Sequence, residues 1–134
     1  MWPPPLLRDR PLSLQLIGVL LLPIVFGAIC GWLLGESDAA YQIVVALGIV
    51  GGISAGYEHA GWREGLVRGV TGGVLFAVAI VVVHEARGVE AAADLPASLG
   101  IMALIYAILG ALFGMLGGWL RARHDARRAA RPAG

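Results

Sequence analysis

The sequence predicts an all-α integral membrane protein, a bundle of four transmembrane helices that forms one domain over residues 1–134. Composition and four long apolar stretches predict it. Hydrophobic residues make up 58% of the chain and charged residues only 14%, whereas a soluble domain carries about 25% charged residues. So few charges cannot give a chain of 134 residues a polar surface. We therefore expect the bilayer to be its solvent.

Four apolar stretches have the length of membrane-spanning helices, since about 20 apolar residues cross the hydrocarbon layer of ~30 Å. The predicted helices cover residues 11–35, 39–58, 65–84 and 95–121. A basic tail, 122–134, follows them. The third helix reaches spanning length if Arg68 extends toward the lipid headgroups. The first stretch is longer than a signal-peptide core and has no A-x-A-like site behind it, so we expect a retained helix.

Arginine placement predicts the orientation. All ten basic residues are arginine, and four spans leave only Arg87 on the opposite side of the membrane from the other nine. Cytoplasmic segments carry such an excess of positive charge. We therefore expect both termini in the cytoplasm, in a bacterial plasma or inner membrane, with the tail arginines near anionic lipid headgroups. A net charge of +1 gives no reason to expect nucleic-acid binding.

Glycine recurs at every fourth position in all four predicted helices. Twelve of the 20 glycines form these stripes: Gly27, Gly31, Gly35, Gly48, Gly52, Gly56, Gly65, Gly69, Gly73, Gly110, Gly114 and Gly118. In lipid, small residues at this spacing let helix backbones approach closely. The stripes indicate tight packing within the bundle, or an oligomer interface or glycine-lined pore. We expect the last three helices to pack closely near the cytoplasm, and the first to pack differently or to face a second subunit.

The turn between the second and third helices has its own motif. Residues 51–69 read GGISAGYEHAGWREGLVRG. This segment, with the general layout of the chain, resembles a group of small, uncharacterised, glycine-rich four-helix bacterial membrane proteins. They share a G-G-x-x-A-G turn followed by G-W-x-x-G-x-x-x-G. The resemblance implies the four-helix fold and no particular activity.

Three ionisable residues at the cytoplasmic end of the second and third helices are candidates for an ion or proton path: Glu58, His59 and Arg68. A carboxylate beside an apolar region can carry protons in membrane proteins. The alternative is a solvated Glu58 paired with Arg63 or Arg68. Glu64 lies four residues before Arg68, in the favourable order for an ion pair on a helix.

No residue pattern indicates an enzyme, a cofactor or a metal site. Each histidine stands beside an acid, but neighbours in a helix point in different directions. His59 and His84 are separated by 25 residues, which is roughly 37 Å along a helix. The serines lack a hydrolase motif, and Cys30 has no nearby base to activate it. We expect no catalytic residue, cofactor ligand or metal ligand.

Three classes of function remain, and a membrane enzyme is the least favoured of them. The first is a non-enzymatic packing, assembly or accessory protein that associates with itself or with a membrane protein partner through the glycine stripes. The alternative is a small channel or transporter for ions or small solutes. Small multidrug exporters and fluoride channels have a similar layout. However, the glutamate that such exporters carry in the first helix and the asparagine characteristic of fluoride channels are both absent here.

Overall fold

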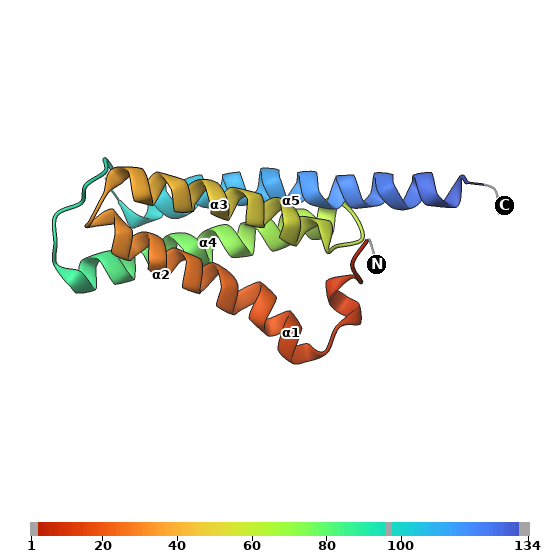
Figure 1. Cartoon of the computed structure of the whole chain (residues 1–134), viewed down its shortest axis with the longest axis horizontal. Helices are drawn as coiled ribbons and strands as arrows, with labels where there is room; N and C mark the ends of the chain where they lie inside the picture. The colour runs from red at the N-terminus through yellow and green to blue at the C-terminus, as the bar shows by residue number, and fades with distance from the viewer. Residues whose placement is uncertain (1–2, 96–97, 132–134) are drawn as a thin grey trace.

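The computed structural model describes residues 3–95 and 98–131, and this part of the chain is helical with no strand (Figure 1). The first span is continuous but consists of three pieces: α1 (Leu12–Leu16), one turn of π-helix called η2 (Ile17–Leu21), and α2 (Leu22–Leu34). The other elements are the short 3₁₀ turn η1 (Leu7–Asp9), α3 (Asp38–Tyr57), α4 (Trp62–Arg87) and α5 (Leu99–Ala129).

All four long helices have the length and composition needed to cross a membrane. Leu12–Leu34 has 23 residues, α3 has 20, α4 has 26 and α5 has 31, against about 20 required. Large apolar side chains cover the outside of the bundle, with Ile43 62% exposed and Leu104 61% exposed. Extensive exposed apolar surface of this kind faces lipid rather than water. The prediction of an all-α bundle with four helices of spanning length is confirmed.

The third span, α4, is longer than the predicted range 65–84. It begins at Trp62, directly after Gly61, whose backbone is extended. It ends at Arg87, where Gly88 adopts a left-handed conformation with φ of 61°. Glycine commonly ends helices in this conformation because it has no Cβ to clash.

The fourth span, α5, begins later and ends later than the predicted range 95–121. Ser98 sets its start, because the hydroxyl of this residue accepts a hydrogen bond from the N–H of Ile101 at 3.2 Å, the usual role of an N-cap serine. The helix continues to Ala129. Most of the segment predicted as a tail therefore extends α5 beyond the other helices (Figure 1).

The two ends of the bundle differ. Residues 3–11, the α3–α4 turn and the far end of α5 lie together at what we call the terminal end (Figure 1). The α2–α3 turn lies at the opposite, loop end. Near the loop end, Cys30, Leu34 and Ile80 are completely buried. The hydroxyls of Tyr41 and Tyr106 form a hydrogen bond of 2.8 Å that joins α3 to α5.

Backbone-to-backbone contacts join α4 and α5. A Cβ at Gly69 would overlap the carbonyl oxygen of Gly110, and a Cβ at Gly114 would overlap that of Gly65. Nine of the twelve stripe glycines meet the backbone of a different helix or of its flanking turn in this way: Gly27, Gly31, Gly56, Gly65, Gly69, Gly73, Gly110, Gly114 and Gly118. The structure thus uses most of the stripes for contacts within the chain.

The first span leaves the bundle halfway along its length. Gly27 and Gly31 hold α2 against the backbone of α4, whereas α1 leans away (Figure 1). The bend coincides with η2 and with Pro23, and proline and π-turns are the usual causes of such bends. Residues 3–11 then return to the bundle, where the N–H of Leu7 donates to the carbonyl of Glu58 at 2.8 Å.

Hydrogen bonds of Arg121 hold the N-terminal segment against α5. This residue is only 7% exposed. Its Nε donates to Asp125 at 2.9 Å, and its Nη1 donates to the carbonyl of Pro4 at 2.8 Å. The guanidinium also lies 5.6 Å from the ring centroid of Tyr57. One side chain therefore ties residues 3–11 to two helices.

We expect Arg121→Met to release the N-terminal segment, because the methionine keeps the apolar stem but donates no hydrogen bond. Hydrogen bonds to charged groups contribute about 1.5–3 kcal/mol each. Limited trypsin digestion in detergent should then cut after Arg8 several times faster than in the unmodified protein; the bond after Arg10 precedes Pro11, and trypsin does not cleave it. Arg123→Met, at an exposed position of the same helix, is the control. Equal cleavage rates in the two variants would contradict this role.

Candidate functional site

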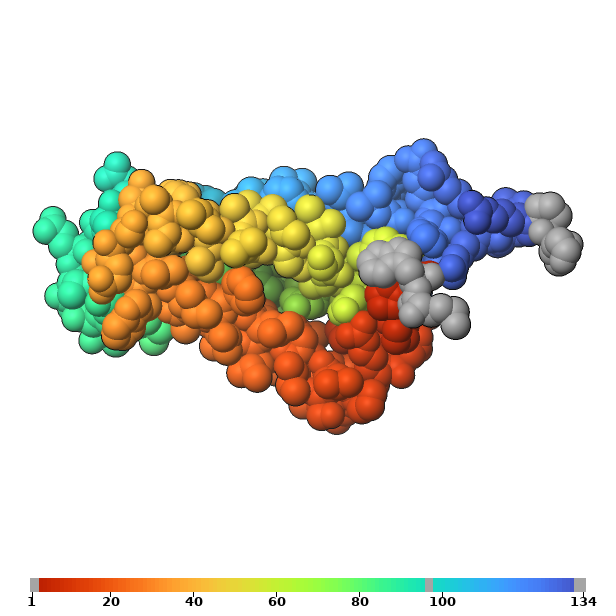
Figure 2. Space-filling view, viewed as in Figure 1, coloured from red at the N-terminus to blue at the C-terminus, as the bar shows by residue number. Residues whose placement is uncertain are grey.

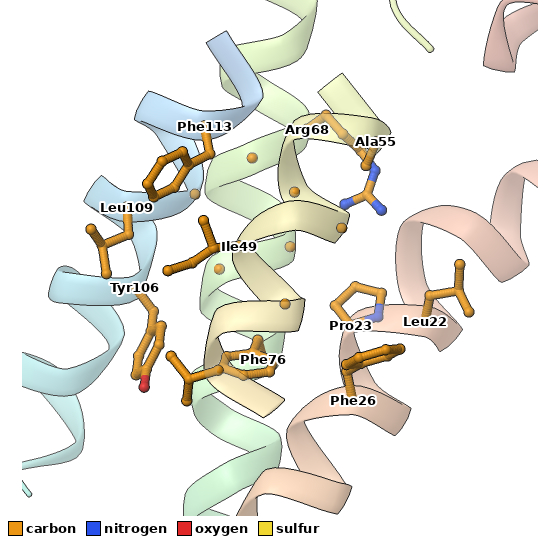
Figure 3. A pocket seen from close by; sticks show the side chains of 18 of the residues that line it. Leu22, Pro23, Phe26, Ile49, Ala55, Arg68, Phe76, Tyr106, Leu109 and Phe113 are labelled. Carbon is orange, nitrogen blue, oxygen red and sulfur yellow. The ribbon is translucent and has the colours of Figure 1, made fainter. Parts of the chain in front are cut away.

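A groove opens on the side of the bundle between α2 and α3, in the half nearer the terminal end, and α4 and α5 line its base (Figures 2 and 3). Its volume is about 190 Å³. In Figure 2 it is the hollow between the orange α2 and the yellow α3, with green residues at its base. Its walls carry mostly apolar side chains and glycine: Leu22, Pro23, Phe26, Gly48, Ile49, Gly52, Ala55, Phe76 and Phe113 are among them.

Glycines of α3 keep the groove open. A Cβ at Gly51 would meet no atom within 4 Å, and one at Gly52 would first meet the Cβ of Phe113 at 3.8 Å. A Cβ at Gly48 would meet only the ring of Phe76, at 3.6 Å. These glycines therefore differ from those that touch another backbone. They leave free volume beside α3, and the outward bend of the first span widens it.

Among the described residues, Arg68 is the only charged one that lines the groove. Its guanidinium extends between Ala55 and Pro23 (Figure 3), and its Nη2 donates to the backbone carbonyl of Gly18 in η2. Gly72, one turn later in α4, provides the room, because a Cβ there would lie 2.8 Å from Nη1 of Arg68.

One expectation about the neighbours of Arg68 is wrong: the predicted ion pair with Glu64 does not form. Glu64 accepts the N–H of Ala60 at 3.1 Å and lies 3.7 Å from Arg8. The difference follows from the fold, because the returning N-terminal segment brings Arg8 to Glu64 and the bend presents the carbonyl of Gly18 to Arg68. The extension of Arg68 toward the headgroups stays a prediction.

The carbonyl of Gly18 needs a donor from outside its own helix. In an α-helix it would accept from the N–H of Leu22, but that N–H donates to Ile17 instead. In a π-helix it would accept from residue 23, which is Pro23 and has no N–H. Neither regular pattern therefore supplies a donor. An unpaired carbonyl is costly in a membrane, where neighbouring helices must satisfy it, and Arg68 does so.

The positive charge of Arg68 is not held in an ion pair. Among residues 3–95 and 98–131, Arg68 forms no ion pair. Glu58, at the end of α3, is paired with Arg10 at 2.8 Å, and Glu64 lies against Arg8. Ionisable residues within membrane spans are costly, and they usually face a cavity and mark a functional site.

The three residues predicted as an ion or proton path have different partners. Glu58 pairs with Arg10, Nδ1 of His59 lies 2.8 Å from the carbonyl of Ala55, and Arg68 binds Gly18. They share one end of the bundle. Within the described part of the chain, however, no hydrogen bond or ion pair joins two of the three.

Sequence reasoning missed the groove itself. The signal for the bend was Pro23 inside an uncharged span, and a proline there predicts a kink. Gly51 and Gly72 do not belong to the stripes of glycine at every fourth position, so the spacing of glycine did not identify them. Nothing local in the sequence indicates that Arg68 meets Gly18, 50 positions away.

Outside the groove, a second recess at the terminal end is lined by His124 and arginines of α5. Nδ1 of His84 is buried and has no hydrogen-bond partner among the residues that the structure describes. Cys30 is a buried free thiol. The described residues contain no group of three His, Cys, Asp or Glu side chains placed to hold a metal ion. The arginines of the extended α5, among them Arg123 and Arg127, are exposed at the terminal end, where contact with anionic headgroups remains a prediction.

The fold and the groove together define a multi-pass helical membrane protein with a lateral, apolar groove. No family model, curated protein or solved structure matches the chain. The likeness of residues 51–69 to small glycine-rich four-helix membrane proteins therefore stays a prediction, and function has to be argued from the groove.

Proposed function

We propose that this protein is a non-enzymatic accessory component of the membrane, and that its groove binds the apolar chain of a membrane amphiphile. One observation carries the proposal: an apolar recess lies within helices of membrane-spanning length and opens sideways, between α2 and α3 (Figure 2). A molecule can enter such a recess from the bilayer without passing through water.

The size and lining of the groove favour a single flexible chain. Its volume of about 190 Å³ is smaller than the roughly 300–1,000 Å³ of pockets that enclose drug-sized ligands. The rings of Phe26, Phe76 and Phe113 stand around it (Figure 3). A segment of one acyl chain fits such a narrow aromatic groove, while the rest of the molecule stays in the lipid.

The glycine stripes give less support to an oligomer than to the groove. Nine of the twelve stripe glycines meet the chain's own backbone, so they are occupied within one subunit. Gly48 and Gly52 face the groove instead. Association with a second copy or another membrane protein through these stripes remains a prediction, and it would have to use the few glycines that the chain leaves open.

A channel has less support than a binding groove. The groove ends toward the loop end at Phe76 and Tyr106, whose rings pack edge to face with centroids 5.1 Å apart. On its floor, the glycine contacts close α4 onto α5.

The distribution of arginine supports an orientation with both termini in the cytoplasm of a bacterial cell, so the groove would open into the cytoplasmic leaflet.

Native mass spectrometry of the protein released from lipid nanodiscs tests this proposal. Lipids on the outer surface leave readily on collisional activation, whereas a chain held in the groove should leave last. We expect one amphiphile per chain to remain after the others have gone. If all bound lipids leave together, with no species that retains one, the groove does not bind a chain.

A further inference from the structure

We propose that Arg68 makes the groove selective for anionic phospholipids, whose phosphate accepts hydrogen bonds from its guanidinium while an acyl chain lies in the groove. This inference rests on the proposed function and specifies the ligand of the same site. It joins three observations: an unpaired positive charge, a fixed guanidinium and an apolar recess beside it.

The guanidinium is held in place and still has donors to spare. Arginine has five N–H donors in a rigid planar fork. The carbonyl of Gly18 takes a bond from Nη2 of Arg68, and no other described residue forms a hydrogen bond with this side chain. The remaining donors match the paired oxygens of a phosphate, which arginine binds in a bidentate manner. Because Gly18 already fixes the side chain, binding orders little that was free.

The position of Arg68 suits a lipid head. Arg68 comes six residues after Trp62 in α4, which is about 9 Å along the helix axis. Trp62 is exposed near the terminal end, and tryptophan prefers the headgroup level. Helix side chains tilt toward the N-terminus of their helix, which in α4 is the terminal end. The guanidinium therefore lies between the headgroup layer and the apolar groove.

Charge selects the class of lipid. Glu58 and Glu64 are engaged with Arg10 and Arg8, and no described carboxylate lies within ion-pair distance of Arg68. Interactions between charges are stronger in such a low-dielectric site than in water. An anionic head supplies the missing negative charge, whereas a zwitterionic head brings its own cation close to the guanidinium and gains less.

Pro23 is a positioning residue for this site. It lacks the N–H that would otherwise approach the carbonyl of Gly18, so that carbonyl is free to hold Arg68. In Pro23→Ala the restored N–H competes for Gly18. Arg68 should then lose its fixed position. Selectivity for anionic lipid should fall.

The test uses nanodiscs that contain equal amounts of phosphatidylglycerol and phosphatidylcholine with identical acyl chains. Native mass spectrometry gives the ratio of the two lipids retained by the protein. We expect the unmodified protein to prefer phosphatidylglycerol by about tenfold or more, and Arg68→Gln to reduce this to about twofold or less, as expected when a charge-assisted pair is lost. Arg63→Gln, an exposed arginine in the same helix, should leave the ratio unchanged.

Each outcome decides a different point. If Arg68→Gln retains both lipids equally, and Pro23→Ala also lowers the ratio, the inference stands. An unchanged ratio in Arg68→Gln overturns the inference and leaves the groove intact. An equal fall of the phosphatidylglycerol preference in Arg63→Gln also overturns the inference, since general surface charge then explains the preference. Displacement of the lipid by inorganic phosphate alone would also overturn the inference. If the unmodified protein retains no lipid at all, the proposed function itself fails.

Discussion

Leucine in place of Gly69 is expected to prevent α4 and α5 from assembling. A Cβ alone at this position would already overlap the carbonyl of Gly110. The obstacle is backbone, which cannot move aside as a flexible side chain would. Overpacking a core costs typically about 1–3 kcal/mol, and we expect Gly69→Leu to exceed that range because two helix axes must separate.

The matched control is Gly51→Leu, where a new Cβ would meet no atom within 4 Å. Both variants add the same side chain to a helix of the same bundle. Unfolding by sodium dodecyl sulfate, followed by circular dichroism, should show a large loss of stability for Gly69→Leu and little change for Gly51→Leu. Similar unfolding curves for the two variants would show that the α4–α5 contact does not hold the bundle together.

Leucine in place of Gly52 is expected to abolish chain binding without unfolding the protein. Its Cβ has room, since the first contact would be with Phe113 at 3.8 Å. The rest of the leucine side chain then occupies the groove. We expect the affinity for an amphiphile to fall at least about tenfold, equivalent to about 1.4 kcal/mol.

Displacement of a fluorescent acyl probe in detergent measures this effect. Ala46→Leu is the control, because Ala46 lies on the exposed surface of the same helix and does not line the groove. The probe should bind Ala46→Leu as it binds the unmodified protein. Equal binding by Gly52→Leu and Ala46→Leu would mean that the probe sits on the outer surface and not in the groove.

Much of the fold follows from local sequence. Four apolar stretches of sufficient length predict four spanning helices, because the bilayer leaves few alternatives for a chain of this composition. The ends of helices were harder to place. The serine that starts α5 is read from its hydrogen bond to Ile101, and helical propensity alone does not reveal it.

The candidate site could not be predicted in the same way. Gly52 and Gly56 belong to one stripe, yet Gly56 meets the backbone of Gly114 while Gly52 faces open space. Spacing shows which glycines share a face of a helix, but not which helix, if any, lies opposite. The contact of Arg68 with Gly18 depends on a bend in another span, and that bend lies at the π-turn Ile17–Leu21 and at Pro23, which follows it in α2.

The most direct test of the central claim is to map where a membrane lipid touches the protein. A phosphatidylglycerol with a photoactivatable diazirine in its acyl chain would be crosslinked to the protein in membranes, and the labelled peptides identified. We predict labelling concentrated in residues 22–26 and 48–55, on the two walls of the groove, and lost from both in Gly52→Leu. Labelling spread evenly over the exposed faces of all four helices, and unchanged in Gly52→Leu, would contradict the account.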